Sequence, residues 1–181
     1  MLICSKLMPR GQGLARVLLA RAAHVSLTWD WRQKSRLDAT DSLGRALGIF
    51  LPRGTVMRGG DVLVAEDGSL IRVEAAPQEV LRISACAEHG TAFDLTRAAY
   101  HLGNRHVPIE LCPTHLQIEP DPVLADMLRA MHMTVTPMAA PFEPEGGAYG
   151  ASHSGHGHAH DHGHSHGHAH GHAHGGHDHG H

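Results

Sequence analysis

The stretch TAFDLTRAAYHLGN, residues 91–104, contains the clearest helix signal in the chain and organises the fold of its second half. Thr91 followed three residues later by Asp94 resembles a capping box, which satisfies backbone N–H groups at a helix start. Gly103 and Asn104 both tolerate the left-handed conformation that ends many helices. Apolar residues recur with the i, i+3, i+4, i+7 spacing of one helix face, namely Leu95, Ala98, Ala99 and Leu102. We therefore predict an amphipathic helix that packs on a sheet through this face.

Short strand patterns and a second helix surround this stretch. Asp121 is placed to cap the second helix, and Pro122 suits its first turn because an N–H there has no intrahelical partner. Pro108 suggests that its strand lies at a sheet edge. The expected elements are a strand at 81–83, the first helix, strands at 107–111 and 116–118, a helix from 122 with Leu124, Met127, Leu128 and Met131 on one face, and a strand at 134–136. This βαββαβ order predicts a ferredoxin-like domain over residues 78–149, in which two helices cover one face of an antiparallel sheet.

Residues 1–77 carry the signals of a small all-β domain, so the expected fold class is α+β. Strand-like runs occur at 27–29, 47–51, 62–64 and 70–73. The last two flank Asp67-Gly68, the pattern of a β-hairpin with its turn at these residues. Pro77 marks the expected join between the two domains.

Composition narrows the possible functions. The 181 residues include 15 basic and 18 acidic groups, a formal charge of −3, which predicts neither a nucleic-acid nor a membrane-binding surface. There is no apolar run of 18 residues and no secretory signal pattern, so we expect a cytoplasmic protein without a membrane span. Cys4, Cys86 and Cys112 are odd in number and lack CxxC spacing, which indicates neither a disulfide framework nor a thiolate zinc site.

The last stretch, residues 150–181, contains 14 of the 20 histidines. The residues between them are Gly, Ala, Ser and Asp, which cannot bury enough surface to offset the entropy of ordering, so we predict a disordered tail. Imidazole is a ligand for nickel, zinc and copper and is mostly neutral near pH 7. The predicted tail ligands are His153, His156, His158, His160, His162, His164, His166, His168, His170, His172, His174, His177, His179 and His181.

Crowding of these imidazoles favours metal binding. Once one imidazole holds an ion, its neighbours on the same flexible tether are present at an effective concentration of roughly millimolar. Protonation of one ring disfavours protonation of the next, because like charges repel. A solvated tail without function and a purification tag are the alternatives, although a tag is normally uninterrupted and this stretch is broken by Asp161, Ser165 and Asp178. The tail does not select its metal, so we interpret it as a reservoir.

Six histidines lie outside the tail. For His24, His89, His115 and His132 the simplest interpretation is a hydrogen-bonded surface or core residue. His101 and His106 differ, because they bracket the end of the first helix and the turn into the predicted edge strand. One histidine cannot fill the coordination sphere of a metal. A two-fold dimer would bring a second copy of the same residue to its axis, because an isologous contact pairs each patch with itself.

The stretch YHLGNRHVP, residues 100–108, resembles the signature of the urease accessory protein UreE family, which are nickel metallochaperones. Similar segments extend over nearly the whole chain, at FLPRG (50–54), GDVL (60–63), VL and ML (123–124 and 127–128) and PFEPE (141–145) through Ala148-Tyr149. The resemblance implies a homodimer joined through the ferredoxin-like domains, with His106 of each subunit binding one nickel ion and His101 as a neighbouring ligand. It also implies a peptide-binding or partner-binding N-terminal domain. The implied partners are the urease accessory GTPase and, through the accessory complex, apo-urease.

The expected function is therefore delivery of nickel for urease maturation, without catalysis. An exposed, incompletely ligated ion can be attacked by a second protein, whereas a closed four-ligand site retains its metal. Exchange should slow at acidic pH, because protonated imidazole cannot ligate. One alternative is a small metallohydrolase, but the folded part has no HExxH or comparable cluster. The other is a histidine-rich nickel or zinc storage or buffering protein, in which the tail is the whole function.

Overall fold

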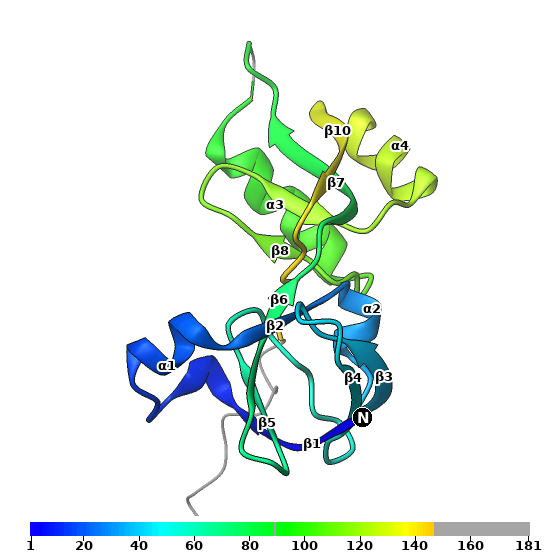
Figure 1. The fold of residues 1–181 in the computed structure, drawn as a ribbon. Helices are drawn as coiled ribbons and strands as arrows, with labels where there is room; N and C mark the ends of the chain where they lie inside the picture. Colours follow the sequence, from blue (N-terminus) through cyan, green and yellow to red (C-terminus); the bar gives the residue numbers. More distant parts are fainter. Residues whose placement is uncertain (89, 147–181) are drawn as a thin grey trace, which may run out of the picture. The chain divides into compact units, whose positions relative to one another are not determined.

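Six strands from the first half of the chain form one mixed sheet in the computed structural model, which describes residues 1–88 and 90–146. Their bounds are β1 Leu2–Met8, β2 Ala23–Leu27, β3 Arg36–Thr40, β4 Ala46–Phe50, β5 Val62–Ala65 and β6 Leu70–Ala75. The strand order is β2-β6-β5-β1-β4-β3 (Figure 1). The pairs β1/β4 and β2/β6 are parallel, and the other pairs are antiparallel. Buried aliphatic side chains such as Leu47, Ile49, Leu63 and Ile71 form the core of this half.

The predicted hairpin at Asp67-Gly68 is confirmed. Strands β5 and β6 pair in antiparallel register, and Gly68 adopts a φ of +84° that a residue with a Cβ rarely accepts. The Ser69 N–H donates to the Asp67 carboxylate over 2.8 Å, which stabilises the turn locally.

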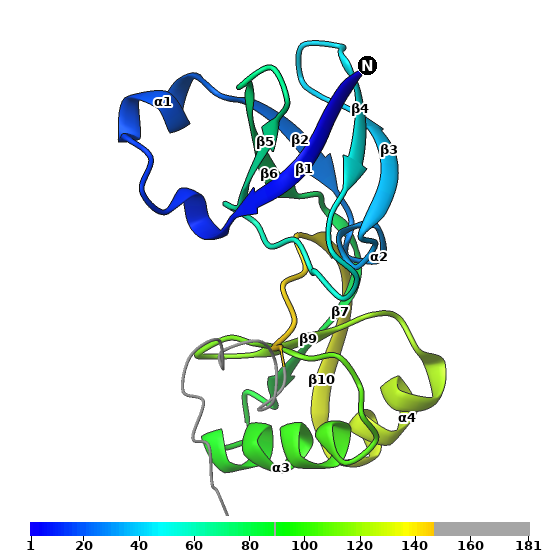
Figure 2. The same cartoon turned by 90° about the horizontal axis from the view of Figure 1, so that it is seen from below.

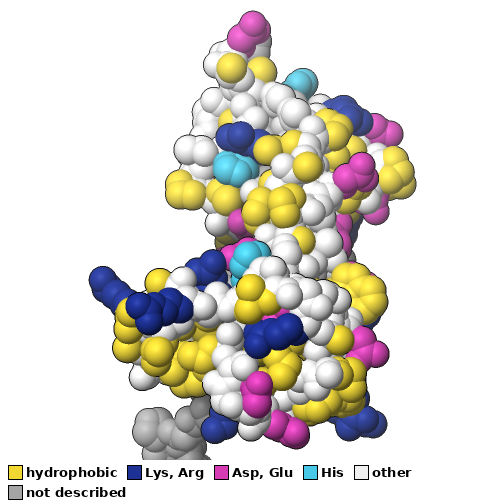
Figure 3. All heavy atoms as spheres, in the orientation of Figure 1, with side chains coloured by type: hydrophobic (Ala, Val, Ile, Leu, Met, Phe, Trp, Pro, Cys, Tyr) yellow, Lys and Arg dark blue, Asp and Glu magenta, His cyan; other side chains and the backbone are white. Residues whose placement is uncertain are grey.

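The prediction that the first half is all-β is wrong in detail. A 3₁₀ turn and two short helices interrupt the strands, at η1 Pro9–Gly11, α1 Arg16–Arg21 and α2 Trp29–Arg32. Lys and Arg side chains gather over α1 (Figure 3). Trp29 begins α2 instead of continuing the strand predicted at 27–29, because its N–H donates to the Gln78 side chain over 2.7 Å and its ring packs against Phe142. These tertiary contacts override the β propensity of tryptophan.

The second half has the predicted βαββαβ order. Its elements are β7 Gln78–Ala85, α3 Ala92–Gly103, β8 Glu110–Leu111, β9 Leu116–Ile118, α4 Pro122–Ala130 and β10 Met133–Ala140. The four strands form an antiparallel sheet in the order β10-β7-β9-β8, and α3 and α4 lie on the same face of it (Figure 2). This is the ferredoxin-like arrangement, with β8 at the edge as Pro108 suggests. The edge strand is shorter than expected, because only Glu110 and Leu111 of the predicted 107–111 pair with β9.

Both helices begin where their capping residues predict. The carboxylate of Asp94 accepts hydrogen bonds from the Thr91 N–H and the Thr91 hydroxyl, each over 2.8 Å. The Asp121 carboxylate accepts from the Leu124 N–H over 2.9 Å, and Pro122 is the first residue of α4. The predicted apolar faces of the two helices pack into one core with the sheet, through Leu95, Ala98, Ala99, Leu102, Leu124, Met127, Leu128 and Met131.

The segment after β10 returns to the first half of the chain, within the single compact unit Met1–Gly146. Phe142 is fully buried against Trp29 and Val80. Arg32 is also fully buried; it donates to the Phe142 carbonyl and, over 2.5 Å, to the Glu143 carboxylate. Glu143 further accepts from the Gly59 N–H over 2.8 Å, so this short segment connects the two halves.

The predicted disordered tail and all of its histidines lie outside the described residues, as does His89. Of the helices in the described ranges, none combines the length and apolar character needed to span a bilayer.

Candidate metal centre

His106 lies in the turn that ends α3, and backbone hydrogen bonds define its position. The His106 N–H donates to the Gly103 carbonyl over 2.9 Å, and the Val107 N–H donates to the Leu102 carbonyl over 3.2 Å. Together these two bonds form a Schellman motif, in which the residue just beyond the helix adopts the left-handed conformation. Leu102 and Val107 both pack in the core of this half, which is the hydrophobic contact that accompanies the motif. The turn therefore holds the backbone of His106 rigidly against the sheet.

The left-handed residue of this turn is His106 itself, with a φ of +56°. The prediction that Gly103 or Asn104 takes this role is wrong, because Gly103 is still helical and Asn104 has a right-handed φ of −65°. Glycine is the usual residue at this position, and an L-residue with a Cβ loses roughly 1 kcal/mol there. Strained residues cluster at functional sites, where the surrounding structure holds them in place. At His106 the packing of Leu102 and Val107 in the core holds the backbone in this conformation.

His101 lies one turn earlier, in the last turn of α3. Its ring contacts the Tyr100 ring edge-to-face with 5.4 Å between centroids, and its carbonyl accepts from the Arg105 guanidinium over 3.0 Å. His101 is half-buried, whereas His106 is exposed. The structure thus brings both predicted ligands to the same helix end, with His106 the more accessible of the two.

One subunit does not complete a metal site with the residues that the structure describes. No group of three or more His, Cys, Asp or Glu side chains among them is arranged to hold an ion. A transition metal needs about four ligands, so an ion bound by His106 and His101 would need further donors.

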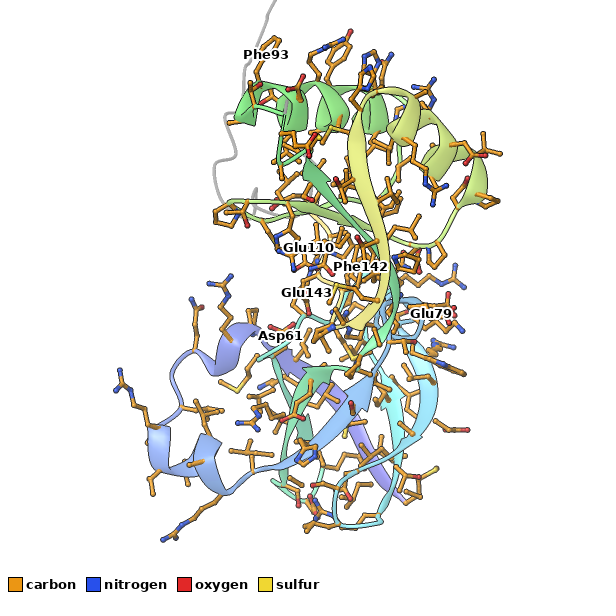
Figure 4. All side chains as sticks on the ribbon, turned by 90° about the horizontal axis from the view of Figure 1, so that it is seen from above. Asp61, Glu79, Phe93, Glu110, Phe142 and Glu143 are labelled. Atoms are coloured by element: carbon orange, nitrogen blue, oxygen red, sulfur yellow. The ribbon has the colours of Figure 1, made fainter. Side chains whose placement is uncertain are left out.

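An exposed apolar surface lies on α3 beside these histidines. Phe93 and Tyr100 are seven residues apart and therefore share a helix face, with exposed fractions of 67% and 68%. Figure 4 shows Phe93 on the outer side of α3, directed away from the sheet. These two residues were not predicted to form a surface, although their i, i+7 spacing on the polar side of the predicted helix indicates one shared exposed face. Large exposed aromatic residues on one face are typical of an interaction surface.

The other described histidines have local roles consistent with the simpler interpretation. His24 lies 3.8 Å from the Glu74 carboxylate, and the His115 ring contacts the Thr114 hydroxyl at 3.3 Å. Burial, together with the positive charge of Arg82, lowers the pKa of His115 below its ordinary value. His132 is exposed and has a φ of +60° at the end of α4, so it is a second left-handed histidine. All three cysteines are free, as predicted.

The edge strand that follows His106 is joined to the segment 141–145. The Glu143 N–H donates to the Glu110 carboxylate over 2.7 Å, and the Glu145 N–H donates to the Ile109 carbonyl over 2.8 Å (Figure 4). These contacts were not predicted, because the hydrogen bond between Glu110 and Glu143 joins residues 33 positions apart in the sequence. They anchor the chain on the C-terminal side of the His106 turn.

Two family models match the chain. The model for the N-terminal domain of the UreE urease accessory protein matches residues 5–76, and the model for its C-terminal domain matches residues 78–170. A urease accessory protein UreE from Albidiferax ferrireducens is 72% identical over 158 residues, which cover 87% of this chain and 91% of that protein. The protein of the same name from Paracidovorax citrulli is 76% identical over 151 residues, covering 83% and 72% respectively. That from Verminephrobacter eiseniae is 73% identical over 158 residues, covering 87% and 94%. With both domain models matched in order and identities above 70%, the chain belongs to the urease accessory protein UreE family.

Proposed function

We propose that this protein is a nickel metallochaperone for urease maturation, in which His106 from each subunit of a homodimer binds one nickel ion. The observation that carries the proposal is the position of His106, which the turn after α3 holds rigid and exposed, one helical turn from His101 and beside the exposed aromatic face of α3. The ion is cargo, so the protein has to bind it without retaining it.

The exposed face of α3 supports the dimer. Phe93 and Tyr100 present large aromatic surface on the helix that leads to His106. A two-fold contact through this face would bury both rings and bring the two copies of His106 toward the axis. Because each subunit contributes the same residue, the site forms only on association.

The proposed hand-over follows from incomplete coordination. Two or four imidazoles from the His101 and His106 pairs leave the ion accessible from the exposed side of the turn. The urease accessory GTPase can then add its own ligands before the histidines release the metal, and apo-urease receives it through the accessory complex. Acidic conditions should weaken binding, because metal competes with protons for the neutral imidazole. The histidines at 153–181 would gather nickel and raise its local concentration by composition alone.

Equilibrium nickel titration tests this proposal on four proteins: the full chain, a chain ending at Gly150, and His106→Ala in each. The chain ending at Gly150 should retain one ion per dimer, and His106→Ala in that background should abolish this binding. The matched control is His132→Ala, which removes the other exposed left-handed histidine and should leave the stoichiometry unchanged. Mass measurement in solution should give a dimer for every variant when nickel is present.

Storage or buffering by the tail is the second candidate, favoured by the 14 tail histidines. It predicts the opposite result: nickel is lost on truncation at Gly150, and His106→Ala has no effect. A monomeric nickel-loaded protein would also contradict the shared site. Delivery itself is measured as nickel transfer to the purified accessory GTPase, which should fail for His106→Ala and succeed for His132→Ala.

A further inference from the structure

The hairpin between β8 and β9 places a thiol and an imidazole side by side. Cys112 follows β8 directly and His115 precedes β9 directly, with two residues between them. The Cys112 N–H donates to the His115 carbonyl over 3.0 Å, which continues the antiparallel register of Leu111 with Leu116. Side chains of directly opposite residues lie on the same face of a sheet, with Cβ atoms about 5 Å apart. This mixed Cys-x-x-His spacing differs from the CxxC spacing that the sequence lacks.

A carboxylate lies on the same face of the sheet as this pair. Glu110 is two residues before Cys112, so the alternation of a strand directs both side chains to one face. Leu116 packs in the core with the helices, so its neighbour His115 and the other polar side chains lie on the face opposite α3 and α4. The Cys112 Sγ lies 4.0 Å from the Glu110 Oε1. With zinc bonds of about 2.3 Å to sulfur and about 2.1 Å to oxygen, two ligands of one tetrahedral ion are about 3.6 Å apart. The thiol and the carboxylate are therefore close to the separation that a shared ion requires.

Gln117 on the same face is an independent indication of a ligand. It lies directly opposite Glu110 in the register of β8 and β9, two residues after His115. The Gln117 side chain is 92% buried, because only 8% of the residue is exposed, and its Oε1 has no hydrogen-bond partner in the part of the chain that the structure describes. Buried amide oxygens in native proteins nearly always accept a hydrogen bond. A water molecule bound to a metal ion on this face would be a strong donor to this oxygen.

One side chain has to rotate before the three groups can share an ion. The Nδ1 atom of His115 contacts the Thr114 hydroxyl at 3.3 Å, so the ring is engaged at the tip of the hairpin. This contact explains why the described side chains do not form a ready set of three ligands. His115 is only half-buried, so rotation of its ring toward Cys112 is a local change. The Glu143 N–H donates to the Oε2 of Glu110, which orients this carboxylate and leaves its Oε1 for an ion (Figure 4).

We propose that Cys112, His115 and Glu110 bind a zinc ion, with water in the fourth position. Thiolate, imidazole and carboxylate are all zinc ligands, and three protein ligands with one water form the open class of zinc site. Strand β8 separates this site from the His106 turn, so the two sites are distinct. A thiolate favours zinc over the other divalent ions more strongly than imidazoles alone do, so this site would bind zinc apart from the nickel cargo. The proposal does not depend on the nickel function.

Absorption spectroscopy with cobalt(II), a coloured substitute for zinc, tests the site on the full chain. The protein is kept reduced, and cobalt is added in excess so that the tail histidines are filled. A thiolate ligand gives a charge-transfer band in the near ultraviolet that imidazole ligands do not give, so neither the tail nor His106 contributes to this signal. The band should appear in the parent protein and disappear when zinc displaces the cobalt. Cys112→Ser should lack the band, and the control Cys86→Ser, at the other half-buried cysteine, should retain it.

Histidine variants test the second ligand. His115→Gln should weaken cobalt binding at the thiolate by roughly tenfold or more, because even the loss of a group that only orients a ligand costs about this much. The control His132→Gln removes an exposed histidine elsewhere and should leave the affinity unchanged. His106→Ala should keep the band whatever its effect on nickel, so failure of this proposal and failure of the nickel proposal give different results.

Alkylation of the parent protein provides a measurement that needs no variant. Zinc should slow the reaction of Cys112 with iodoacetamide, because a metal-bound thiolate is a poorer nucleophile, and should leave the rate at Cys86 unchanged; mass spectrometry separates the two sites. Equal alkylation of Cys112 with and without zinc would overturn the proposal. The same holds for a parent protein without the cobalt band, for a band that survives Cys112→Ser, and for a band that Cys86→Ser abolishes.

Discussion

At the scale of single residues, the informative feature is the position of the left-handed conformation after α3. The residue types at 103 and 104 suggested the wrong place for it, and His106 takes it instead. The reason is not local: the turn extends until Val107 reaches the core beside Leu102, and His106 is the residue that this packing leaves at the strained position. A candidate ligand was thus identified by sequence, but its conformation was set by contacts of its neighbours.

Replacing His106 with glycine should raise stability while removing the metal site. Glycine accepts a φ of +56° without strain, so His106→Gly should increase the free energy of unfolding by roughly 0.5 to 1 kcal/mol. Urea denaturation of the metal-free protein measures this change, and nickel titration of the same sample should show loss of the interfacial ion.

The matched variant is His132→Gly, since His132 has a φ of +60°. It should be stabilised by a similar amount while retaining full nickel binding. His106→Ala keeps the strain and should gain little. A loss of stability in His106→Gly would show that the imidazole makes a compensating contact in the folded protein.

At the scale of elements, the helices of the second half were predictable and several strands were not. The capping residues of a helix and the 3.6-residue repeat of its apolar residues lie within a short stretch of sequence. The starts of α3 and α4 could therefore be located from Thr91, Asp94 and Asp121. Strands β1 and β3 carry no such local signal. Strand β1 pairs with β4 and β5, some 40 to 60 residues away, and its place in the sheet depends on those partners.

The capping box of α3 should make the free energy of unfolding depend on pH in the acidic range. Two hydrogen bonds lower the pKa of Asp94 in the folded protein: the one from the Thr91 N–H has the larger effect, and the one from the Thr91 hydroxyl has the next largest. A carboxylate with a lowered pKa contributes stability above its unfolded pKa of about 3.9, and this contribution is lost as pH falls through the folded pKa. Asp94→Asn should therefore be less stable at pH 7 and show a shallower loss of stability below pH 4.

Chemical denaturation at a series of pH values measures this effect. Thr91→Val serves as the intermediate case, because it keeps the backbone donor and removes the hydroxyl. If the free energy of unfolding of Asp94→Asn falls with decreasing pH as steeply as that of the parent protein, the acid sensitivity belongs to other carboxylates, such as the buried Asp41.

At the scale of the whole molecule, the two halves are connected through the segment 141–145. Arg32 is fully buried, and its guanidinium contacts the Leu27 carbonyl, the Phe142 carbonyl and the Glu143 carboxylate. The guanidinium carbon of Arg58 lies over the Trp29 ring, 4.7 Å from the ring centroid. Arg58 also donates a hydrogen bond to the Pro144 carbonyl over 2.6 Å. These contacts of Arg32 and Arg58 with the segment 141–145 join residues 86 to 111 positions apart, so no window of sequence reveals them.

Breaking this junction should uncouple the two halves. Arg32→Met should lower stability by roughly 3 kcal/mol, because it leaves carbonyls and part of a carboxylate without their buried partner. Calorimetry should show one unfolding transition for the parent protein and a broadened or split transition for Arg32→Met. A double-mutant cycle with Glu143→Gln should give a coupling of roughly 1 to 3 kcal/mol, and a coupling near zero would show that the pair acts independently. Lys34→Met, at the exposed Lys34–Asp30 pair, is the control and should change little.

The amino-acid sequence by itself determined the βαββαβ order, the starts of both helices and the β5–β6 hairpin, because each depends on residues near one another in the chain. The choice of His101 and His106 as ligands came from the resemblance of the stretch 100–108 to a family and stays a prediction. The tertiary structure alone decided that His106 takes the left-handed position after α3, that Glu110 and Arg32 bind the segment 141–145, and that β2 and β3 are the two edge strands of the first sheet. Those features arise where distant segments compete for the same space and hydrogen-bonding groups, and this competition is resolved only when the whole chain is packed.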